Sequence, residues 1–574
     1  MNDYLRLLQS YCDTLVRTQI LSDDSNFHGA VPCPACHLLH GRVVDTVYPL
    51  TVLWCKTGEA RYLTAACNVV NFAEHNLVGK RGEYYNDALT DWEGPTVFAA
   101  VALGETLFYH EDALPIAVKE QWQTVFRRLA AFIRVRFFEA DFSANINYFA
   151  TAAAAMAVAY RLLGEESFRG AAYLHAKKVR GFFTRNHILT GEGSGVSPKG
   201  FRAVDIGYNV EESLPSLTLF ALLLEDEEWL DFTTHAWYAH LDFLLPDGGW
   251  DNTFGSRQYK WTYYGSRTSD GCQTGLSLLA HRDPLLAEAA ERNFRLLAAC
   301  SQDGYLYGGP MYHEAGEAPC FHHALAHAKA VAALVEHDFV PEATVLRPRE
   351  RAYGLRYFPD LDIAMVAKGK LRATVSAYDY AVRPEAAVGG GTLTMLYHMT
   401  YGPLFAATMA KYTRYEELNM QLPRGPVSCG TVRIEADGLS SVFALDAVLT
   451  KEETEEAVLL SATGCLQNQR RTEKGANYTL TYRFAEEGMI FTAACDRDAI
   501  LYLPIVCSKA STLTVWGREA VVSNKKGTVS LRSDGVFLCE NPNERFFNPV
   551  GGFLYADLRL SLAAGKTVTV TLQA

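Results

Sequence analysis

The spacing of hydrophobic residues divides the chain into two parts. Before about residue 342, apolar residues recur at steps of three and four, which is the period of amphipathic helices. The clearest such segments are 96–109, 148–163, 214–224 and 324–336, where Ala and Gly also permit close helix contact. The sequence contains no repeat of fixed length. A closed toroid of paired helices is therefore favoured over an open solenoid.

After the charged stretch Arg347–Arg351 the pattern changes to short segments in which apolar and polar residues alternate, as they do in strands. Examples are 363–367, 371–378, 512–516 and 567–572, with one helix-like interruption expected at 404–418. The predicted fold class is multidomain α+β. An N-terminal (α/α) helical toroid over residues 1–345 would be followed by a C-terminal antiparallel β-sandwich over residues 350–574.

Composition narrows the possible functions. A length of 574 residues exceeds what one hydrophobic core supports, and the net charge of -12 argues against a nucleic-acid-binding surface. The first residues form an amphipathic pattern and not a signal peptide, and no apolar run reaches the roughly 20 residues that span a bilayer. The 13 cysteines are an odd number scattered along the chain, which is typical of reduced thiols. We expect a cytoplasmic protein.

One cysteine pair has the spacing of a metal knuckle. Cys33 and Cys36 are separated by Pro and Ala and are followed by His37 and His40, and thiolates and imidazoles are the ligands that zinc prefers. A strong zinc signal needs a second such pair. Two cysteines in a tight proline turn are the alternative, and His40 and Arg42 have a separate interpretation as substrate-binding groups that point into the toroid.

Polar and aromatic residues gather in several predicted loops between helices, where sites are usually built. Asn145, Asn147 and Tyr148 stand at the start of an Ala-rich helix, and Trp92 lies in an earlier loop. Two Asn before a helix are often caps. An amide beside a phenol can also hold a carboxylate and move a proton, so we predict that these residues bind substrate.

The segment from Asp205 to Ser213 places Tyr208 and Asn209 just before a helix. Glu211 and Glu212 near that helix start either complement the helix dipole or serve the site. Tyr208 is the stronger catalytic candidate because its phenol precedes the helix in a loop. Asn209 and Glu211 are predicted to bind substrate.

The densest loop runs from Trp250 to Asp270 and mixes six aromatic residues with two Arg and one Lys. Aromatic faces stack on sugar rings and cations pair with carboxylates, so the mixture favours an acidic saccharide. The catalytic candidates here are Arg257, Tyr264 and Arg267, and the binding candidates are Trp250, Asp251, Lys260 and Tyr263.

A histidine pair opens the last predicted helix. His322 and His323 lie at its start, whereas His327 lies within it and is interpreted as a core residue. An imidazole acts as acid or base near neutral pH, so His322 and His323 are catalytic candidates.

These motifs together resemble heparinase II/III-like proteins, and within that group they look most like the rhamnose-glucuronate lyases, polysaccharide lyase family 27. The resemblance covers most of the predicted toroid and is weaker in the sandwich. The motifs that carry it are Cys33-Pro-Ala-Cys36, His40-Gly-Arg42, Asn145-Ile-Asn-Tyr148, Asp205 to Ser213 and Lys260 to Asp270, with Gly389 to Gly391, Tyr397-His398 and Tyr401-Gly-Pro403 in the sandwich.

The resemblance implies cleavage by β-elimination beside a uronic acid. Such a reaction needs a group that neutralises the carboxylate, a base for the C5 proton and an acid for the leaving group. Asn147 falls where related lyases place their neutralising Asn, and Tyr148 stands where a His often follows it. Arg257 or Arg267 would assist Asn147. The remaining candidates, Tyr208 or Tyr264 with His322 or His323, would exchange the protons, and His398 would bind substrate.

Two other functions remain open at this point. A glycoside hydrolase on the same toroid would need two carboxylic acids across the bond, and candidates are Asp91, Glu192, Glu211, Glu212, Asp251 and Asp270. A non-catalytic saccharide-binding protein is the second alternative. The lyase chemistry requires no cofactor, apart from a possible structural zinc. The expected partner is a uronic-acid-containing oligosaccharide, with no nucleic acid and no membrane.

Overall fold

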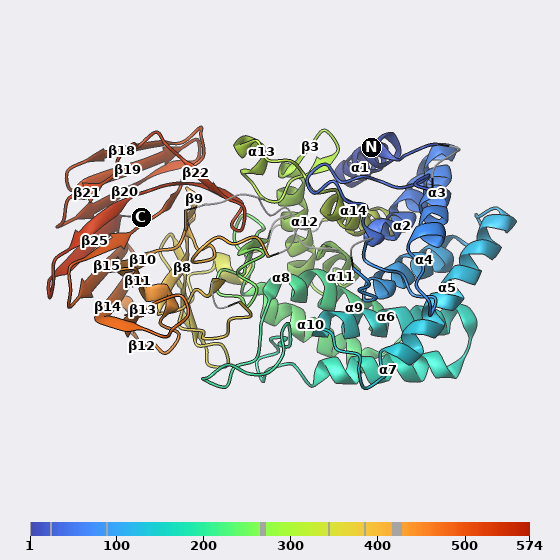
Figure 1. The fold of residues 1–574 in the computed structure, drawn as a ribbon, viewed down its shortest axis with the longest axis horizontal. Coiled ribbons are helices and arrows are strands. Elements are labelled where there is room, and N and C mark those ends of the chain that lie inside the picture. The colour runs from blue at the N-terminus through green and yellow to red at the C-terminus, as the bar shows by residue number, and fades with distance from the viewer. Residues whose placement is uncertain are drawn as a thin grey trace.

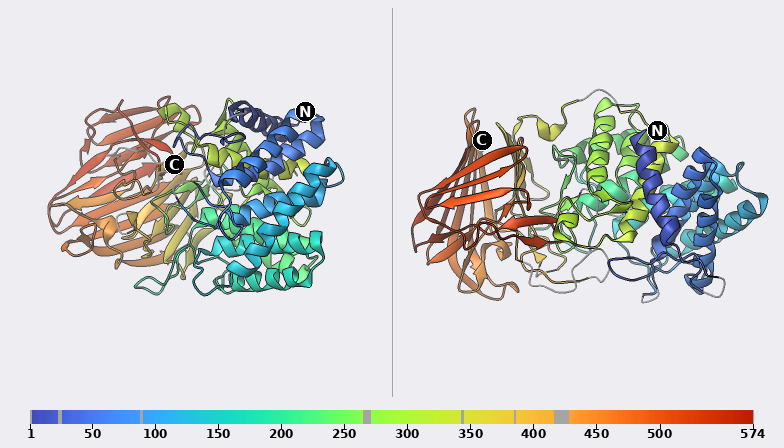
Figure 2. Two further views of the ribbon diagram at one scale, coloured as in Figure 1. Left: turned by 45° about the vertical axis from the view of Figure 1, so that its right-hand side comes forward. Right: turned by 90° about the horizontal axis from the view of Figure 1, so that it is seen from above.

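In the computed structural model the described residues are 2–22, 26–87, 90–264, 271–341, 345–383, 386–415 and 428–573, without the side chains of 264 and 321–326. They form a helical region followed by a β-rich region, and the two lie side by side along the long axis of the molecule (Figures 1 and 2). The expected helical N-terminal region and antiparallel β-rich C-terminal region are therefore confirmed.

Six helices of the described part contact one another in cyclic order, because each packs on the next and the last packs on the first. These inner helices are α2 (Val47–Thr57), α4 (Thr96–His110), α6 (Ile146–Leu163), α9 (Leu214–Leu223), α11 (Gln273–Leu278) and α14 (Phe321–Glu336).

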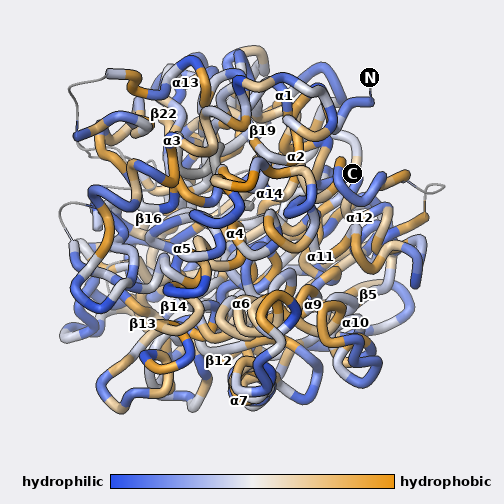
Figure 3. Tube along the Cα trace, turned by 90° about the vertical axis from the view of Figure 1, so that its right-hand side faces the viewer, coloured by the Kyte–Doolittle hydropathy of each residue, from blue (hydrophilic) through white to orange (hydrophobic). Residues whose placement is uncertain are grey.

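Each inner helix also packs against a helix adjacent to it in sequence or, for α14, against the first helix of the chain. These outer helices are α1 (Asp3–Thr18), α3 (Ala60–Asn76), α5 (Ile116–Arg136), α7 (Glu166–Arg180), α10 (Glu227–Leu241) and α12 (Pro284–Ala299). Figure 3 views this region along the long axis and shows hydrophilic positions gathered at its outer turns.

The inner helices approach closely because their facing residues are small. Residues 150 to 155 of α6 are one Thr and five Ala, all buried. A Cβ atom on Gly104 of α4 would lie 2.6 Å from Val158 of α6, so glycine is required at this crossing. Helix α6 is apolar and long enough to cross a membrane, but most of it is buried inside the molecule and it packs on α4, α7 and α9. It is a core helix.

Short elements connect the helices and lead into the strands. They are η1 (Gly41–Thr46), α8 (Ile206–Tyr208), the π-helical turn η2 (Asn209–Ser213), β1 (Trp250–Asp251), β2 (Tyr263–Tyr264), β3 (Ser301–Gln302), β4 (Tyr305–Leu306), α13 (Tyr312–Ala315) and η3 (Pro348–Glu350).

The β-rich region begins with a five-stranded antiparallel sheet in the order β5-β6-β7-β8-β9. Its strands are β5 (Gly354–Phe358), β6 (Ile363–Lys368), β7 (Leu371–Ser376), β8 (Thr392–His398) and β9 (Gly402–Ala406). A three-stranded sheet in the order β17-β23-β22 contains β17 (Ile505–Val506), β22 (Phe546–Asn548) and β23 (Phe553–Ala556).

A 13-stranded sheet completes this region, in the order β18-β19-β20-β25-β15-β14-β13-β11-β10-β16-β24-β21 with β12 beside β13. Its strands are β10 (Arg433–Ala436), β11 (Leu439–Ser440), β12 (Val448–Glu453), β13 (Ala457–Gln467), β14 (Lys474–Ala485), β15 (Gly488–Cys495), β16 (Ala499–Tyr502), β18 (Thr512–Trp516), β19 (Glu519–Asn524), β20 (Gly527–Ser533), β21 (Phe537–Leu538), β24 (Arg559–Leu562) and β25 (Thr567–Gln573), and the turn η5 (Ser441–Phe443) follows β11.

The larger sheet and the five-stranded sheet share one hydrophobic core, which includes Val366 and Val375 on one side and Leu460 and Leu480 on the other. The helix-like interruption expected at 404–418 is wrong for the residues that the structure describes. Residues up to 406 belong to β9, and residues 407–415 contain no helix. The apolar residues there imitate a helical period because β9 is buried on both faces.

Candidate active site

Three segments of the helical region meet in the structure. They are the start of α6, the α8–η2 turn and the loop from 250 to 264. Asp205 accepts a hydrogen bond from the backbone amide of Tyr208 at 3.1 Å, and Asn252 accepts one from Ile206 at 2.9 Å. The cap of α8 is thus fixed to the later loop. The following π-helical turn is a local irregularity of a kind that is frequent at functional sites.

Tyr208 lies beside two cations from that loop. The ammonium of Lys260 donates a hydrogen bond to the phenol oxygen at 3.3 Å, and the guanidinium carbon of Arg257 lies 4.3 Å from the ring centre. Trp261 packs at a ring-centre distance of 5.9 Å. Positive charge at this position stabilises negative charge on the phenol oxygen. The structure therefore brings three predicted site residues, Tyr208, Arg257 and Lys260, into one cluster.

Glu192 connects this cluster to α6. One carboxylate oxygen lies 3.0 Å from Arg257, and the other accepts the backbone amide of Asn147 at 3.0 Å in the first turn of the helix. The side chain is fully buried. Burial raises the pKa of Glu192 to about 7, although the nearby guanidinium of Arg257 opposes that rise. A buried carboxyl with a perturbed pKa is typical of functional sites.

The other residues at the start of α6 lie against the same network. The side-chain amide of Asn147 donates a hydrogen bond to the Glu212 carboxylate, and Asn147 is buried. Tyr148 accepts a hydrogen bond from the indole of Trp92 at 3.0 Å, and both rings are partly exposed. Burial and the charge of Glu212 raise the pKa of Tyr148. Asn145 occupies the N-cap position of α6 and is partly exposed.

Arg42 approaches this group from η1. Its guanidinium donates to Asp45 at 2.6 Å and lies 3.6 Å from the ring centre of Phe98 on α4. Its charge acts on the Tyr148 phenol and lowers the pKa of that group, opposing burial. The structure therefore places Arg42 near Tyr148. The predicted neighbour His40 is directed elsewhere, to Cys36, whose sulfur lies 3.1 Å from its Nε2 atom.

Two predicted binding residues lie in the packed interior. Asn209 is fully buried and donates to the Leu189 carbonyl at 2.8 Å, with the ring of His240 3.1 Å from the same nitrogen. Glu211 is fully buried too, and its charge raises the pKa of Cys272. The structure therefore places both residues of the π-helical turn in the interior, which local sequence spacing does not indicate.

Three further predicted binding residues are found between the helical region and the strands. Trp250 is fully buried, and Tyr263 donates a hydrogen bond to Asp247 at 3.0 Å. Asp251 pairs with Arg349 at 2.6 Å and is fully buried. Asp251 and Tyr263 are thus engaged by partners other than Tyr208, although β1 packs against α8.

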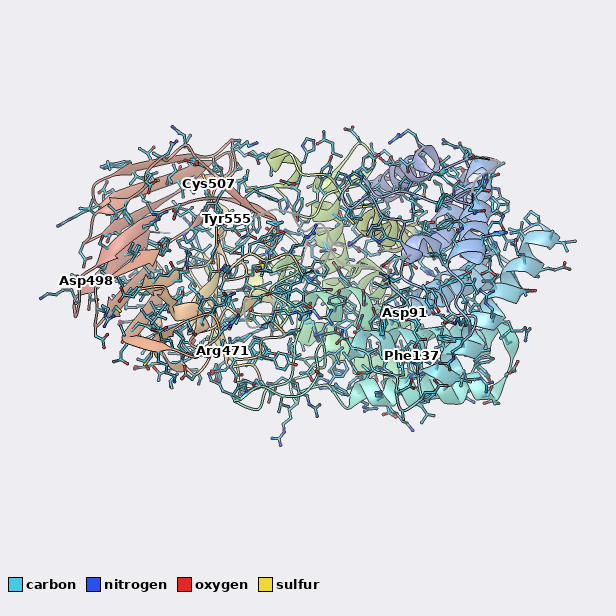
Figure 4. All side chains as sticks on the ribbon, viewed as in Figure 1. Asp91, Phe137, Arg471, Asp498, Cys507 and Tyr555 are labelled. Carbon is cyan, nitrogen blue, oxygen red and sulfur yellow. The ribbon has the colours of Figure 1, made fainter. Side chains whose placement is uncertain are left out.

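His398 lies at the end of β8 in the five-stranded sheet. Its Nδ1 atom is 2.9 Å from the hydroxyl of Thr400, and its side chain is buried. Burial and the charge of Lys370 lower its pKa. The structure places it in this turn of the sheet and not with the cluster around Tyr208. Asp91, a carboxylate considered for hydrolysis, is exposed on the helical region, whereas Arg471 lies in the β-rich region (Figure 4).

Several candidates lie outside the described residues. Arg267 and Asp270 fall in the range 265–270, and for Tyr264, His322 and His323 only the backbone is described, in β2 and α14. These assignments stay predictions.

Two positions of these clusters were not predicted from the sequence. Asp205 is the cap that orients Tyr208, and the signal for it was an acidic residue three positions before that tyrosine. Cys320 lies 3.8 Å from Cys33, sulfur to sulfur, although 287 positions separate them in the sequence. Glu192 was considered only as a hydrolase acid.

Two pockets share Ser194 and Val196, which follow Glu192 in the chain. One of them is lined by aromatic and cationic residues and the other reaches the β-rich region. The first includes Phe142, Phe149, Phe182, Lys178 and Arg202; the second includes Lys199, Asp379, Tyr380, Asp446 and Arg471.

Comparison with known proteins gives consistent matches over the whole chain. Residues 8–350 match the family described as ulvan lyase N-terminal domain, and residues 355–574 match the ulvan lyase C-terminal domain. A broad-specificity ulvan lyase from Formosa agariphila is 37% identical over 573 residues, which cover 95% of this chain and 89% of that protein.

Solved structures share the fold at low identity. A chondroitin AC lyase from Streptomyces coelicolor A3, in complex with chondroitin sulphate, has a TM-score of 0.56 at 13% identity, covering 100% of this chain and 80% of the other. A mutant heparan sulfate lyase from Pedobacter heparinus has a TM-score of 0.50 at 10% identity, covering 100% and 83%. These similarities concern the fold alone.

Proposed function

Because this chain belongs to the ulvan lyase family, and is therefore a polysaccharide lyase that acts by β-elimination, we propose that its substrate is a polysaccharide in which a uronic acid is linked to rhamnose. The relative from Formosa agariphila is named for ulvan, which contains rhamnose and uronic acids. The predicted enzyme class, a polysaccharide lyase, is confirmed. The finer likeness to rhamnose-glucuronate lyases stays a prediction.

We infer that the helical region is an (α/α) toroid and the β-rich region a sandwich. The cyclic contacts of the six inner helices support the first, because α14 packs on α2 and so completes the circle. The core shared by the five-stranded and 13-stranded sheets supports the second. In this arrangement the substrate would enter where the loops at one end of the toroid meet the sandwich.

The observation that carries the mechanism is the contact between Tyr208 and Lys260. We propose that Tyr208 removes the C5 proton of the uronic acid, after which the C4–C5 double bond forms and the C4–O bond breaks. The phenol of Tyr208 would then return this proton to the departing oxygen. Lys260 would neutralise the carboxylate beside C5, which makes that proton more acidic.

Other members of the cluster would position these two groups. Arg257 is held by Glu192 and lies against the ring of Tyr208, so we infer that it orients the phenol. Asn147 contacts Glu192 through its backbone and Glu212 through its side chain. Its role would be to hold both carboxylates in the network, and not to grip the substrate by itself. Tyr148 and Trp92 are partly exposed and would contact the sugar.

One of the two pockets supports an acidic saccharide. Lys178 and Arg202 are exposed cations, and they line one pocket together with Phe142, Phe149 and Phe182. Aromatic faces pack on sugar rings, and cations pair with carboxylate or sulfate groups. Sugars on one side of the cleaved bond would occupy this pocket.

A hydrolase is the less favoured alternative, because three of its six candidate carboxylates are engaged in the fold. Glu192 pairs with Arg257, Asp251 pairs with Arg349, and Glu212 accepts a hydrogen bond from Asn147. Hydrolysis needs one carboxyl to protonate the leaving oxygen and a second to act on water or on the sugar. The family match favours elimination on independent grounds.

The test is to incubate the purified chain with ulvan, chondroitin sulfate and heparan sulfate, while recording near-ultraviolet absorbance and product masses. Rising absorbance with unsaturated uronate products from ulvan would support the proposal. Cleavage without absorbance would show hydrolysis and contradict it. Elimination confined to chondroitin sulfate or heparan sulfate would keep the lyase but overturn the rhamnose-containing substrate.

A further inference from the structure

We propose that Cys33, Cys36, His40 and Cys320 form a structural zinc site that joins the start of the helical region to its last helix. The metal-binding atoms of Cys33, Cys36 and His40 all lie within 4.8 Å of one another. The Cys320 sulfur lies 3.8 Å from that of Cys33, and the Cys36 sulfur lies 3.1 Å from Nε2 of His40. Three thiolates and one imidazole are a common ligand set for structural zinc.

The distances fit coordination better than a disulfide. Two thiolates that bind one tetrahedral zinc at about 2.3 Å lie roughly 3.8 Å apart, which is the separation found between Cys33 and Cys320. The sulfurs of a disulfide lie about 2.05 Å apart. The separation of Cys36 and His40 is slightly shorter than the roughly 3.5 Å expected across a zinc. Cys320 lies outside the group of three residues whose ligand atoms are within 4.8 Å of one another, so both the His40 ring and the Cys320 side chain would move when zinc binds.

The backbone around the first three ligands is built as a tight knuckle. The amide of Cys33 donates to the Leu38 carbonyl at 3.1 Å, and the amide of His37 donates to the Cys33 carbonyl at 2.9 Å. His37 has a φ of 59°, a left-handed conformation that turns the chain sharply. Both thiols of the knuckle therefore point to one side. The sequence left two interpretations of Cys33 and Cys36, a tight turn or a pair of metal ligands. The turn that the structure shows is compatible with both.

The fourth ligand comes from a distant part of the chain. Cys320 is buried at the N-cap position of α14, and α14 packs on α1, α2 and η1. A zinc bound here would tie the 33–40 loop to α14. Cys320 precedes His322 and His323 by two and three positions, and His40 precedes Arg42 by two. Bound zinc would thus hold in place the two segments that lead to these candidate site residues, and it would take no part in the reaction.

Zinc binding would convert three thiols to thiolates and release their protons to solvent, with the imidazole bound in its neutral form. Because the site holds elements that are far apart in sequence, most of its effect should be on stability. Loss of the metal should lower the melting temperature and leave the β-rich region folded.

The experiment is metal analysis of the intact chain, purified from cells grown with added zinc. We expect one zinc per chain in the wild type. Cys320→Ser and Cys36→Ser should each lower retained zinc by about tenfold or more. Cys67→Ser is the matched control, since Cys67 is a half-buried thiol on α3 of the same region, and it should retain the full zinc content.

A second measurement covers the case in which the variants fail to fold. Exchange of zinc for cobalt in the wild-type chain should produce a thiolate-to-cobalt charge-transfer band and the visible spectrum of a tetrahedral site. Absence of zinc together with absence of this band would overturn the proposal. A thiol count two below thirteen after unfolding in chelator would overturn it in favour of a disulfide. Full zinc in Cys320→Ser would overturn the role of the fourth ligand.

Discussion

The guanidinium of Arg349 lies 2.6 Å from the carboxylate of Asp251, and both side chains are fully buried where the helical region meets the strands. The hydroxyl of Thr374 donates to the same carboxylate oxygen at 2.6 Å and accepts from Arg349 at 2.8 Å. A loop, a linker turn and a strand of the five-stranded sheet are thereby joined at one point. Since the loop also carries Lys260, this point sets where the site lies relative to the strands.

Removal of the Arg349 guanidinium should leave the buried carboxylate of Asp251 without its cation. We expect Arg349→Met to lower the free energy of unfolding by about 3–5 kcal/mol, measured by urea denaturation at neutral pH. The control is Arg497→Met, because Arg497 pairs with Asp437 on the surface at 2.6 Å. That exposed pair should change stability by less than about 1 kcal/mol. Equal effects of the two substitutions would contradict the structural role given to Arg349.

The phenol of Tyr208 should matter for turnover and not for folding. Loss of a proton-transfer group typically lowers kcat by about 100-fold or more, and we expect such a loss in Tyr208→Phe with an unchanged urea midpoint. Tyr238→Phe is the control, since Tyr238 on the outer helix α10 donates a hydrogen bond to Asp283. Wild-type turnover in Tyr208→Phe would exclude this phenol as the base.

Tyr208 and Lys260 should act as a unit. Lys260 would neutralise the carboxylate beside the proton that Tyr208 removes, so Lys260→Met weakens the same step that Tyr208 serves, and the double variant should be hardly slower than Tyr208→Phe. Steady-state kinetics of both single variants and the double variant give the coupling. Independent, multiplying losses in kcat would show that the 3.3 Å contact has no catalytic meaning.

His240 should make the protein sensitive to acid. Its ring is fully buried, with Nδ1 2.8 Å from the Ala236 carbonyl and Nε2 3.1 Å from the Asn209 amide, which suits the neutral form. Burial lowers its pKa from 6.5 to about 4. Below pH 6.5 the imidazole of His240 is protonated in the unfolded chain but stays neutral in the folded chain. The free energy of unfolding therefore falls as the pH drops toward 4.

This difference amounts to about 2 kcal/mol between pH 7 and pH 5. We therefore expect His240→Gln to reduce the loss of unfolding free energy over that interval by about this amount, measured by urea denaturation at each pH. His235→Gln, at an exposed position of the same helix, should leave the pH dependence unchanged. An unchanged profile in His240→Gln would show that another group causes the acid sensitivity.

Local patterns were enough to identify the elements. The predicted segment 96–109 is α4 (Thr96–His110), and the predicted strand 512–516 is β18 (Thr512–Trp516). The period of apolar residues depends only on residues close together in the sequence. It arises because one face of each helix or strand is buried. The segment 404–418 failed because β9 is buried on both sides, so its apolar residues have no alternation to distinguish them from a helix.

The sequence predicted only part of the candidate site. The loops that contain Tyr208, Arg257 and Lys260 were found from their density of aromatic and charged residues. Within the same loops Asp251 and Tyr263 have equally suitable chemistry, yet their side chains pair with Arg349 and Asp247. Composition cannot separate these two groups, because the direction of each side chain depends on a partner such as Arg349, which is 98 positions from Asp251.

The sequence by itself determined the two-part architecture, the saccharide-lyase chemistry of the loops and the cysteine knuckle at residues 33–36. Only the tertiary structure decided that Glu192 links Arg257 to the start of α6, and that Cys320 lies beside Cys33. The physical reason is the range of the interactions. Helix and strand patterns depend on residues a few positions apart in the sequence. A site consists of residues that come into contact only when the chain has packed into a core.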